Sequence, residues 1–131
     1  MKIRFATVFL AAFLLVGTVA ARAQSADSTR TAEGRANQLT ERMKTELSLT
    51  EEQYPKVQAI NLRHAQKNEA IFQGTGARFA KFRSLKSSQK DKSKEMKSVL
   101  TSDQYKKYEQ MMEEMKNKAR QQYQSRGQSA G

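Results

Sequence analysis

Apolar residues recur at intervals of three and four along most of the chain, and no segment alternates strictly between polar and apolar positions. The first pattern is typical of amphipathic helices, whereas strict alternation would indicate half-buried strands. The pattern predicts four helices, at residues 31–47, 51–73, 77–100 and 102–120. The glycines of Gly74-Thr75-Gly76 separate the second helix from the third, because glycines so close together stop or bend a helix. The sequence therefore predicts an all-α domain over residues 31–120.

A short pattern, Leu-Thr-x-x-Gln-Tyr, occurs twice and precedes two of these helices. The copies supply Leu49, Thr50, Gln53 and Tyr54, and then Leu100, Thr101, Gln104 and Tyr105. In a capping box, the Thr side chain accepts from a backbone N–H of the first turn, and the Gln three residues later bonds back to the N–H of the cap. The flanking Leu and Tyr have the spacing of a hydrophobic staple. Each copy thus predicts a helix start, and each cap should stabilise the fold by about 1 kcal/mol.

Pro55 interferes with the first of these starts. It follows the motif directly, where its missing N–H and its ring remove a helical hydrogen bond. The helix is expected either to be distorted there or to begin closer to Pro55. The second copy has Lys106 at this position and no such conflict.

The first 23 residues have the three parts of a secretory signal. Lys2 and Arg4 form a basic start, Phe5–Ala20 is an apolar run, and Ala21-Arg22-Ala23 is a small-x-small cleavage pattern. An uncleaved anchor is the weaker interpretation, because the run is shorter than the roughly 20 residues that span a bilayer. Cleavage would leave a mature chain from Gln24. The polar segments 24–30 and 121–131 are expected to be disordered.

Charge is unevenly distributed along the predicted mature chain. Without Lys2, Arg4 and Arg22, 21 of the 24 basic residues remain against 13 acidic ones, a net charge of +8. Residues 77–98 hold eight bases and two acids. For an exported chain, this segment favours acidic proteins or anionic surfaces over nucleic acid as partners.

The side chains that most enzymes and metal sites require are scarce. The chain has no cysteine and one histidine, His64. A nucleophile needs an adjacent base, and zinc needs several Cys or His ligands. The sequence therefore predicts no enzyme activity, no catalytic residues, no cofactor and no metal. His64 is expected to be partly buried or at an interface.

The doubled motif resembles the LTxxQ family of periplasmic proteins that includes Spy and CpxP. The resemblance depends on Leu49, Thr50 and Gln53, and on Leu100, Thr101 and Gln104. It implies long bent helical hairpins that pair into a cradle-shaped antiparallel homodimer in the periplasm. Spy-like members hold unfolding proteins without ATP, and CpxP-like members repress an envelope-stress sensor kinase. One branch of the family responds to zinc, but zinc binding is not expected in this chain, because the Cys and His ligands that zinc needs are missing.

An apolar stripe flanked by cations is the predicted client-binding surface. The candidate residues are Phe72, Phe79, Phe82, Arg83, Lys86, Lys90, Lys94, Met96, Lys97 and Met111. The same stripe is equally compatible with a buried dimer face, because every amphipathic helix must bury its apolar side. Most of the methionines are expected in the core, whereas Met111 is expected to be exposed.

These observations predict a periplasmic holding chaperone that binds unfolding or partly folded client proteins on a basic, apolar dimer surface. The alternative is a CpxP-like regulator that docks on the sensor domain of an envelope-stress kinase. Binding to anionic lipid through residues 77–100 is a third possibility. Nucleic acid is not expected as a partner.

Overall fold

The computed structural model describes residues 30–128, which form four helices and no strand. The helices are α2 (Ala32–Leu47), α3 (Gln53–Gln73), α4 (Arg78–Val99) and α5 (Ser102–Gln128). The all-α prediction is confirmed. The predicted signal peptide and nearly all of segment 24–30 lie outside the described residues.

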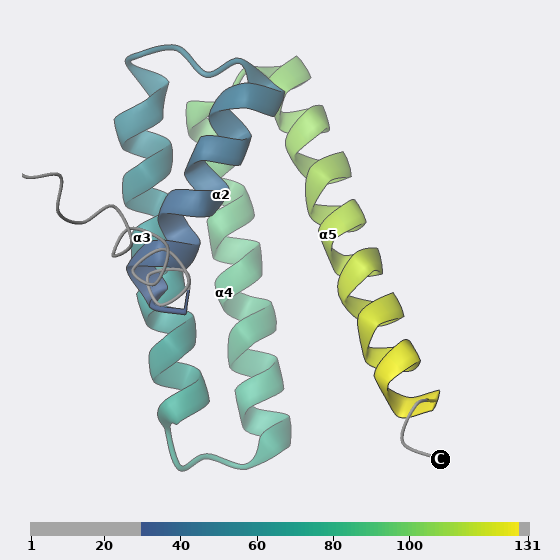
Figure 1. Ribbon diagram of the computed structural model, residues 1–131. Coiled ribbons are helices and arrows are strands. Elements are labelled where there is room, and N and C mark those ends of the chain that lie inside the picture. Colours follow the sequence, from purple (N-terminus) through teal and green to yellow (C-terminus); the bar gives the residue numbers. More distant parts are fainter. Residues whose placement is uncertain (1–29, 129–131) are drawn as a thin grey trace, which may run out of the picture.

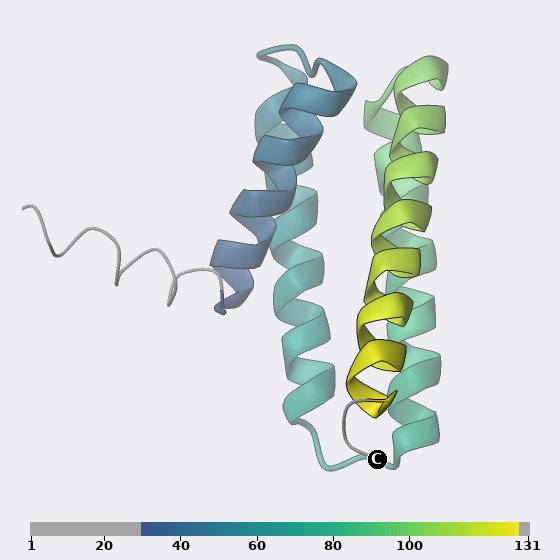
Figure 2. The same cartoon turned by 45° about the vertical axis from the view of Figure 1, so that its right-hand side comes forward.

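The helices form two hairpins that meet at one end of the molecule. The α2–α3 and α4–α5 connections lie together at the top of Figure 1, and the α3–α4 turn lies at the opposite end. Helix α3 packs extensively against both α2 and α4, whereas α5 touches α2 and α4 far less. Figure 2 shows α2 beside α3 and α5 in front of α4. Helix α5 diverges from α4 toward the α3–α4 turn (Figure 1).

The hydrophobic core is drawn from all four helices. Its buried members are Met43, Leu47, Val57, Ile60, Met96, Leu100, Tyr108 and Met111. Leu39, Leu49, Val99, Tyr105, Met112 and Met115 are partly buried against this cluster. Several of these residues lie at the ends of α2 and α4, and others belong to the two Leu-Thr-x-x-Gln-Tyr motifs. Much of the core therefore lies near the end of the bundle where the two motifs are, here called the motif end.

Both capping boxes are present with reciprocal hydrogen bonds. Gln53 N donates to Thr50 Oγ1 at 3.2 Å, and Thr50 N donates back to Gln53 Oε1 at 3.1 Å. In the second motif, Gln104 N donates to Thr101 Oγ1 at 3.3 Å, and Thr101 N donates to Gln104 Oε1 at 3.0 Å. The prediction that these residues start helices is confirmed.

Pro55 delays the first helix by two residues relative to the second. Helix α5 begins directly after Thr101, whereas α3 begins three residues after Thr50. Tyr54 N still donates to Thr50 O at 3.0 Å, but Pro55 has no N–H to offer Glu51 O, so the next bond of the ladder cannot form. The predicted slip of this start is therefore observed, although it stops at Gln53.

The predicted disordered tail is wrong over most of its length. Helix α5 continues through residues 121–128 instead of ending at Arg120. Gln fills four of these eight positions and favours helix, and adding residues to a formed helix avoids the cost of nucleation. Residues 129–131 lie outside the described part. The other helix ends fall within two residues of their predicted positions.

Ser48 ends α2 in a left-handed conformation, with φ 52° and ψ 55°. Such backbone costs a residue with a Cβ atom roughly 1 kcal/mol or more, and glycine avoids that cost. We therefore expect Ser48→Gly to raise the free energy of unfolding by about 1 kcal/mol, as measured by urea denaturation. The matched control is Ser87→Gly, on the exposed side of α4, which should lower it by about the same amount. Equal destabilisation by both variants would contradict this account.

Candidate functional site

The two repeated motifs, 51 residues apart in the sequence, meet side by side in the fold. Gln53 Nε2 donates to Gln104 Oε1 at 2.8 Å, and Gln104 Nε2 donates to Gln53 Oε1 at 2.9 Å. Each amide also reaches a carbonyl at the end of a neighbouring helix, Val99 O at 3.1 Å from Gln53 and Leu47 O at 3.3 Å from Gln104. Both amides therefore use their donors and acceptors within the fold, which makes the motif residues structural.

The cross-motif bond can be tested separately from the caps. In Gln104→Glu, the carboxylate can still accept from Thr101 N, but it can no longer donate to Gln53 or to Leu47. We expect a loss of about 2 kcal/mol in unfolding free energy at pH 7, because part-buried acceptors lose their donors. Gln110→Glu, exposed on the same helix, should change it by less than about 0.5 kcal/mol. Urea denaturation of both variants is the measurement, and equal effects would refute a special role for the amide pair.

The opposite end of the bundle exposes large aromatic side chains. Phe72, at the end of α3, and Phe79 and Phe82, at the start of α4, are 64%, 71% and 63% exposed. The guanidinium of Arg83 lies 5.8 Å from the centre of the Phe79 ring. Lys81 Nζ donates to Phe72 O at 2.9 Å across the turn. This end of the molecule therefore combines uncovered rings with cations.

A groove of about 1140 Å³ runs between α4 and the diverging part of α5. We call it the aromatic–basic groove; its main lining residues are Phe79, Phe82, Arg83, Leu85, Lys86, Lys90, Lys116 and Arg120. Five of the predicted client-binding residues thus lie together. Lys94 and Lys97 are exposed further along α4, outside the groove. Lys116 and Arg120 were not predicted as site residues, because the sequence does not show that α5 faces this part of α4.

The prediction of client binding is wrong for two residues. Met96 is 0% exposed and Met111 is 2% exposed, and both belong to the core. Met96 shares an apolar stripe with Phe79 and Phe82, but the neighbouring helices cover that stripe only near the motif end. Met111 lies three residues after Tyr108 and four before Met115, so it belongs to the buried face of α5 rather than beside it.

Residues 20–108 match the family described as "Domain of unknown function (DUF4890)". The match covers more than half of the chain. The protein therefore belongs to the DUF4890 family. No curated protein matches it, and no solved structure does. The family description names no activity, and the resemblance to the LTxxQ family stays a prediction.

The single histidine of this DUF4890 protein ties α3 to α4. His64 is buried, with Nδ1 3.1 Å from Ser88 Oγ and Nε2 3.1 Å from Glu95 Oε1. Glu95 also pairs with Arg63. Burial lowers the pKa of His64, and the positive charges of Lys92, Arg63 and Lys67 lower it further. The prediction of a buried or interfacial histidine is confirmed.

Within residues 30–128, no group of three His, Cys, Asp or Glu side chains is placed to hold a metal ion. Across the same residues, no helix has the length and apolarity to cross a membrane.

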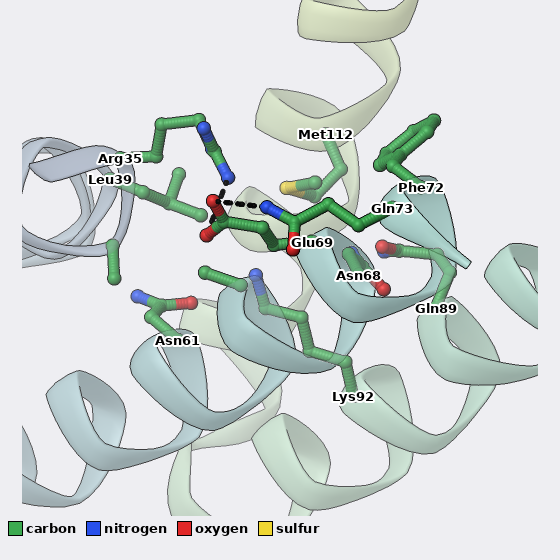
Figure 3. Close-up of a pocket in the computed structure, with 12 residues that line it drawn as sticks. Arg35, Leu39, Asn61, Asn68, Glu69, Phe72, Gln73, Gln89, Lys92 and Met112 are labelled. Carbon is green, nitrogen blue, oxygen red and sulfur yellow. Dashed lines mark hydrogen bonds and ion pairs between the residues drawn. The ribbon is translucent and has the colours of Figure 1, made fainter. Parts of the chain in front are cut away.

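Lys92 on α4 is a buried cation, and it is not among the predicted site residues. It is 7% exposed, and no other residue of the described part hydrogen-bonds or ion-pairs with its ammonium. Its side chain extends into a cavity lined by all four helices, on the side of Asn61 (Figure 3). Burial lowers its pKa to about 8. Helical spacing sets Lys92 apart from the exposed lysines around it, since it lies four residues from both Ser88 and Met96, the other buried residues of α4.

A lysine whose pKa falls on folding destabilises the protein at any pH where it is charged. We expect Lys92→Met, which keeps the apolar stem, to raise the unfolding free energy by about 2 to 3 kcal/mol at pH 7. Between pH 8 and 10.5 the unfolded chain keeps the Lys92 proton that the folded chain releases, so the wild type should gain stability relative to the variant as the pH rises.

Urea denaturation at pH 7 and pH 10 measures both effects. Lys107→Met, which removes an exposed charge from α5, is the control and should change stability little. A Lys92→Met variant that is less stable than the wild type at pH 7 would show that the ammonium is compensated within the fold.

Proposed function

We propose that the protein is an exported, periplasmic holding chaperone that binds unfolding proteins without nucleotide in the aromatic–basic groove. The observation that supports this most is the exposure of Phe79 and Phe82, which both line the groove. Contiguous exposed apolar surface on a small protein is typical of an interaction site. Unfolding proteins offer complementary apolar segments, so their binding would remove these rings from water.

The groove suits weak, reversible binding. Fully burying one Phe side chain is worth about 1.5 to 3 kcal/mol, and part of that gain is lost in ordering a flexible client. Arg83, Lys86 and Lys90 line the same groove, so acidic segments of a client would be attracted at long range. Rings and cations together favour broad rather than sequence-specific recognition.

The cradle-shaped homodimer is part of this proposal. Because α5 leaves much of α4 uncovered, a second copy has an apolar face against which to pack. Only a pairing that leaves Phe79 and Phe82 uncovered would extend the binding surface across two subunits. The mass of the mature chain in solution tests this directly, and a strict monomer would contradict the cradle.

Suppression of aggregation tests the chaperone proposal. The mature chain, Gln24–Gly131, is mixed with a chemically denatured model protein, and light scattering is followed on dilution. We expect suppression at up to equimolar ratio, without nucleotide. The double variant Phe79→Ser with Phe82→Ser should need at least about tenfold more protein for the same effect, because about 3 kcal/mol of apolar binding is removed.

The matched control is Tyr123→Ser, since Tyr123 is 83% exposed but lies outside the groove. It should suppress aggregation as the wild type does. Loss of suppression in the control as well, or full suppression by the double variant, would contradict a role for the groove.

The second candidate is a regulator that docks on an acidic sensor domain. Lys94 and Lys97 favour it, because they extend the positive face of α4 beyond the groove without adding apolar area. Such a contact would be one-to-one and would weaken strongly between 50 and 500 mM salt. Capture of many partners with weak salt dependence would favour the chaperone, and flotation with acidic liposomes would favour lipid binding.

A further inference from the structure

A second cavity, separate from the aromatic–basic groove, lies among all four helices. Its volume is about 640 Å³, within the range of small-molecule sites. Leu39 of α2, Phe72 of α3 and Met112 of α5 supply apolar walls, and Lys92 of α4 reaches in from below (Figure 3). The cavity thus combines apolar surface with one buried positive charge.

The hydrogen bonds around Asn61 fix an acceptor beside that charge. Thr40 Oγ1 donates to Ala36 O at 2.7 Å, so its oxygen is left to accept from Asn61 Nδ2 at 3.0 Å. Turning the Asn61 amide over would place two acceptors against each other. Its Oδ1 must therefore point away from Thr40, on the side where Lys92 enters (Figure 3).

Asn68, two helical turns further along α3, also lines the cavity. The Oδ1 atoms of Asn61 and Asn68 are both buried, and neither accepts a hydrogen bond from the described residues. Neither oxygen hydrogen-bonds with Lys92 Nζ, so neither compensates its charge. Lys92 therefore keeps a net positive charge inside the cavity.

The acid among the lining residues does not supply the missing negative charge. Glu69 lines the cavity, but its carboxylate pairs with Arg35 at 3.7 Å and accepts from Gln73 Nε2 at 3.3 Å. Figure 3 shows both partners directed at Glu69. With Glu69 engaged by Arg35, the excess charge of the cavity is the single positive charge of Lys92.

We propose that this cavity binds a monocarboxylate that carries an apolar chain. Its carboxylate pairs with Lys92, and its chain lies against Leu39, Phe72 and Met112. An uncharged amphiphile would leave Lys92 unpaired, and an organic cation would be repelled by it. A small inorganic anion would leave the apolar walls unfilled. An acyl carboxylate and the C-terminal residue of a peptide share the required chemistry.

Isothermal titration calorimetry on the mature chain at pH 7 tests the proposal with matched probes. Octanoate should bind at least tenfold more tightly than 1-octanol, which lacks the charge, and than acetate, which lacks the chain. N-acetyl-leucine compared with its amide then tests whether a peptide end is also accepted. Octanoate binding no tighter than that of 1-octanol or acetate would overturn the proposal.

Two variants connect the binding to the cavity. Lys92→Met should lower the affinity for octanoate at least tenfold and leave the affinity for 1-octanol unchanged. Lys107→Met should bind both compounds with the affinity of the wild type. Circular dichroism checks that each variant is folded. Equal octanoate affinity in Lys92→Met and wild type would overturn the assignment.

This inference is independent of the chaperone proposal. The Phe79→Ser, Phe82→Ser double variant should bind octanoate normally, and Lys92→Met should still suppress aggregation. Failure of one proposal is therefore distinguishable from failure of the other.

Discussion

The reciprocal amide pair of Gln53 and Gln104 is the contact on which the arrangement of the helices depends. Each amide closes the start of its own helix, bonds to the other amide and satisfies a carbonyl at the end of a third helix. Four helix ends, which would otherwise leave backbone groups unpaired, thus meet at one junction. The doubled motif is needed because each copy completes the hydrogen bonds of the other.

The helices meet at the motif junction, and α5 diverges from α4 toward the other end of the bundle (Figure 1). Near the junction the apolar stripe of α4 is covered, and Met96 is fully buried there. Toward the α3–α4 turn the same stripe emerges as Phe79 and Phe82, because α5 has diverged from α4. The same apolar stripe of α4 therefore contributes to both the core and the exposed groove. The direction of α5 determines where along α4 the stripe changes from buried to exposed.

Local features of the fold could be predicted from the sequence, and long-range ones could not. Helix positions, both capping boxes and the effect of Pro55 follow from interactions within a few residues. The pairing of Gln53 with Gln104 and the approach of Lys116 and Arg120 to α4 depend on which helix faces meet. The spacing of Lys92 from Ser88 and Met96 fits the buried face of α4, but a lysine is rarely buried, so its charge argued against that position. The candidate groove was therefore half predicted: its α4 residues were found, and its α5 residues were not.

The burial of Lys92 bears on how the protein balances stability against binding. A small chain without disulfides has little stability in reserve, yet it buries most of a lysine side chain that has no acidic partner. A methionine would fill the same space at lower cost, so folding alone gives no reason for a charge at this position. A ligand carboxylate would supply the missing partner, and the free energy lost in the unliganded fold would be regained on binding. The cost of the charge and the affinity for an anion then have the same physical origin.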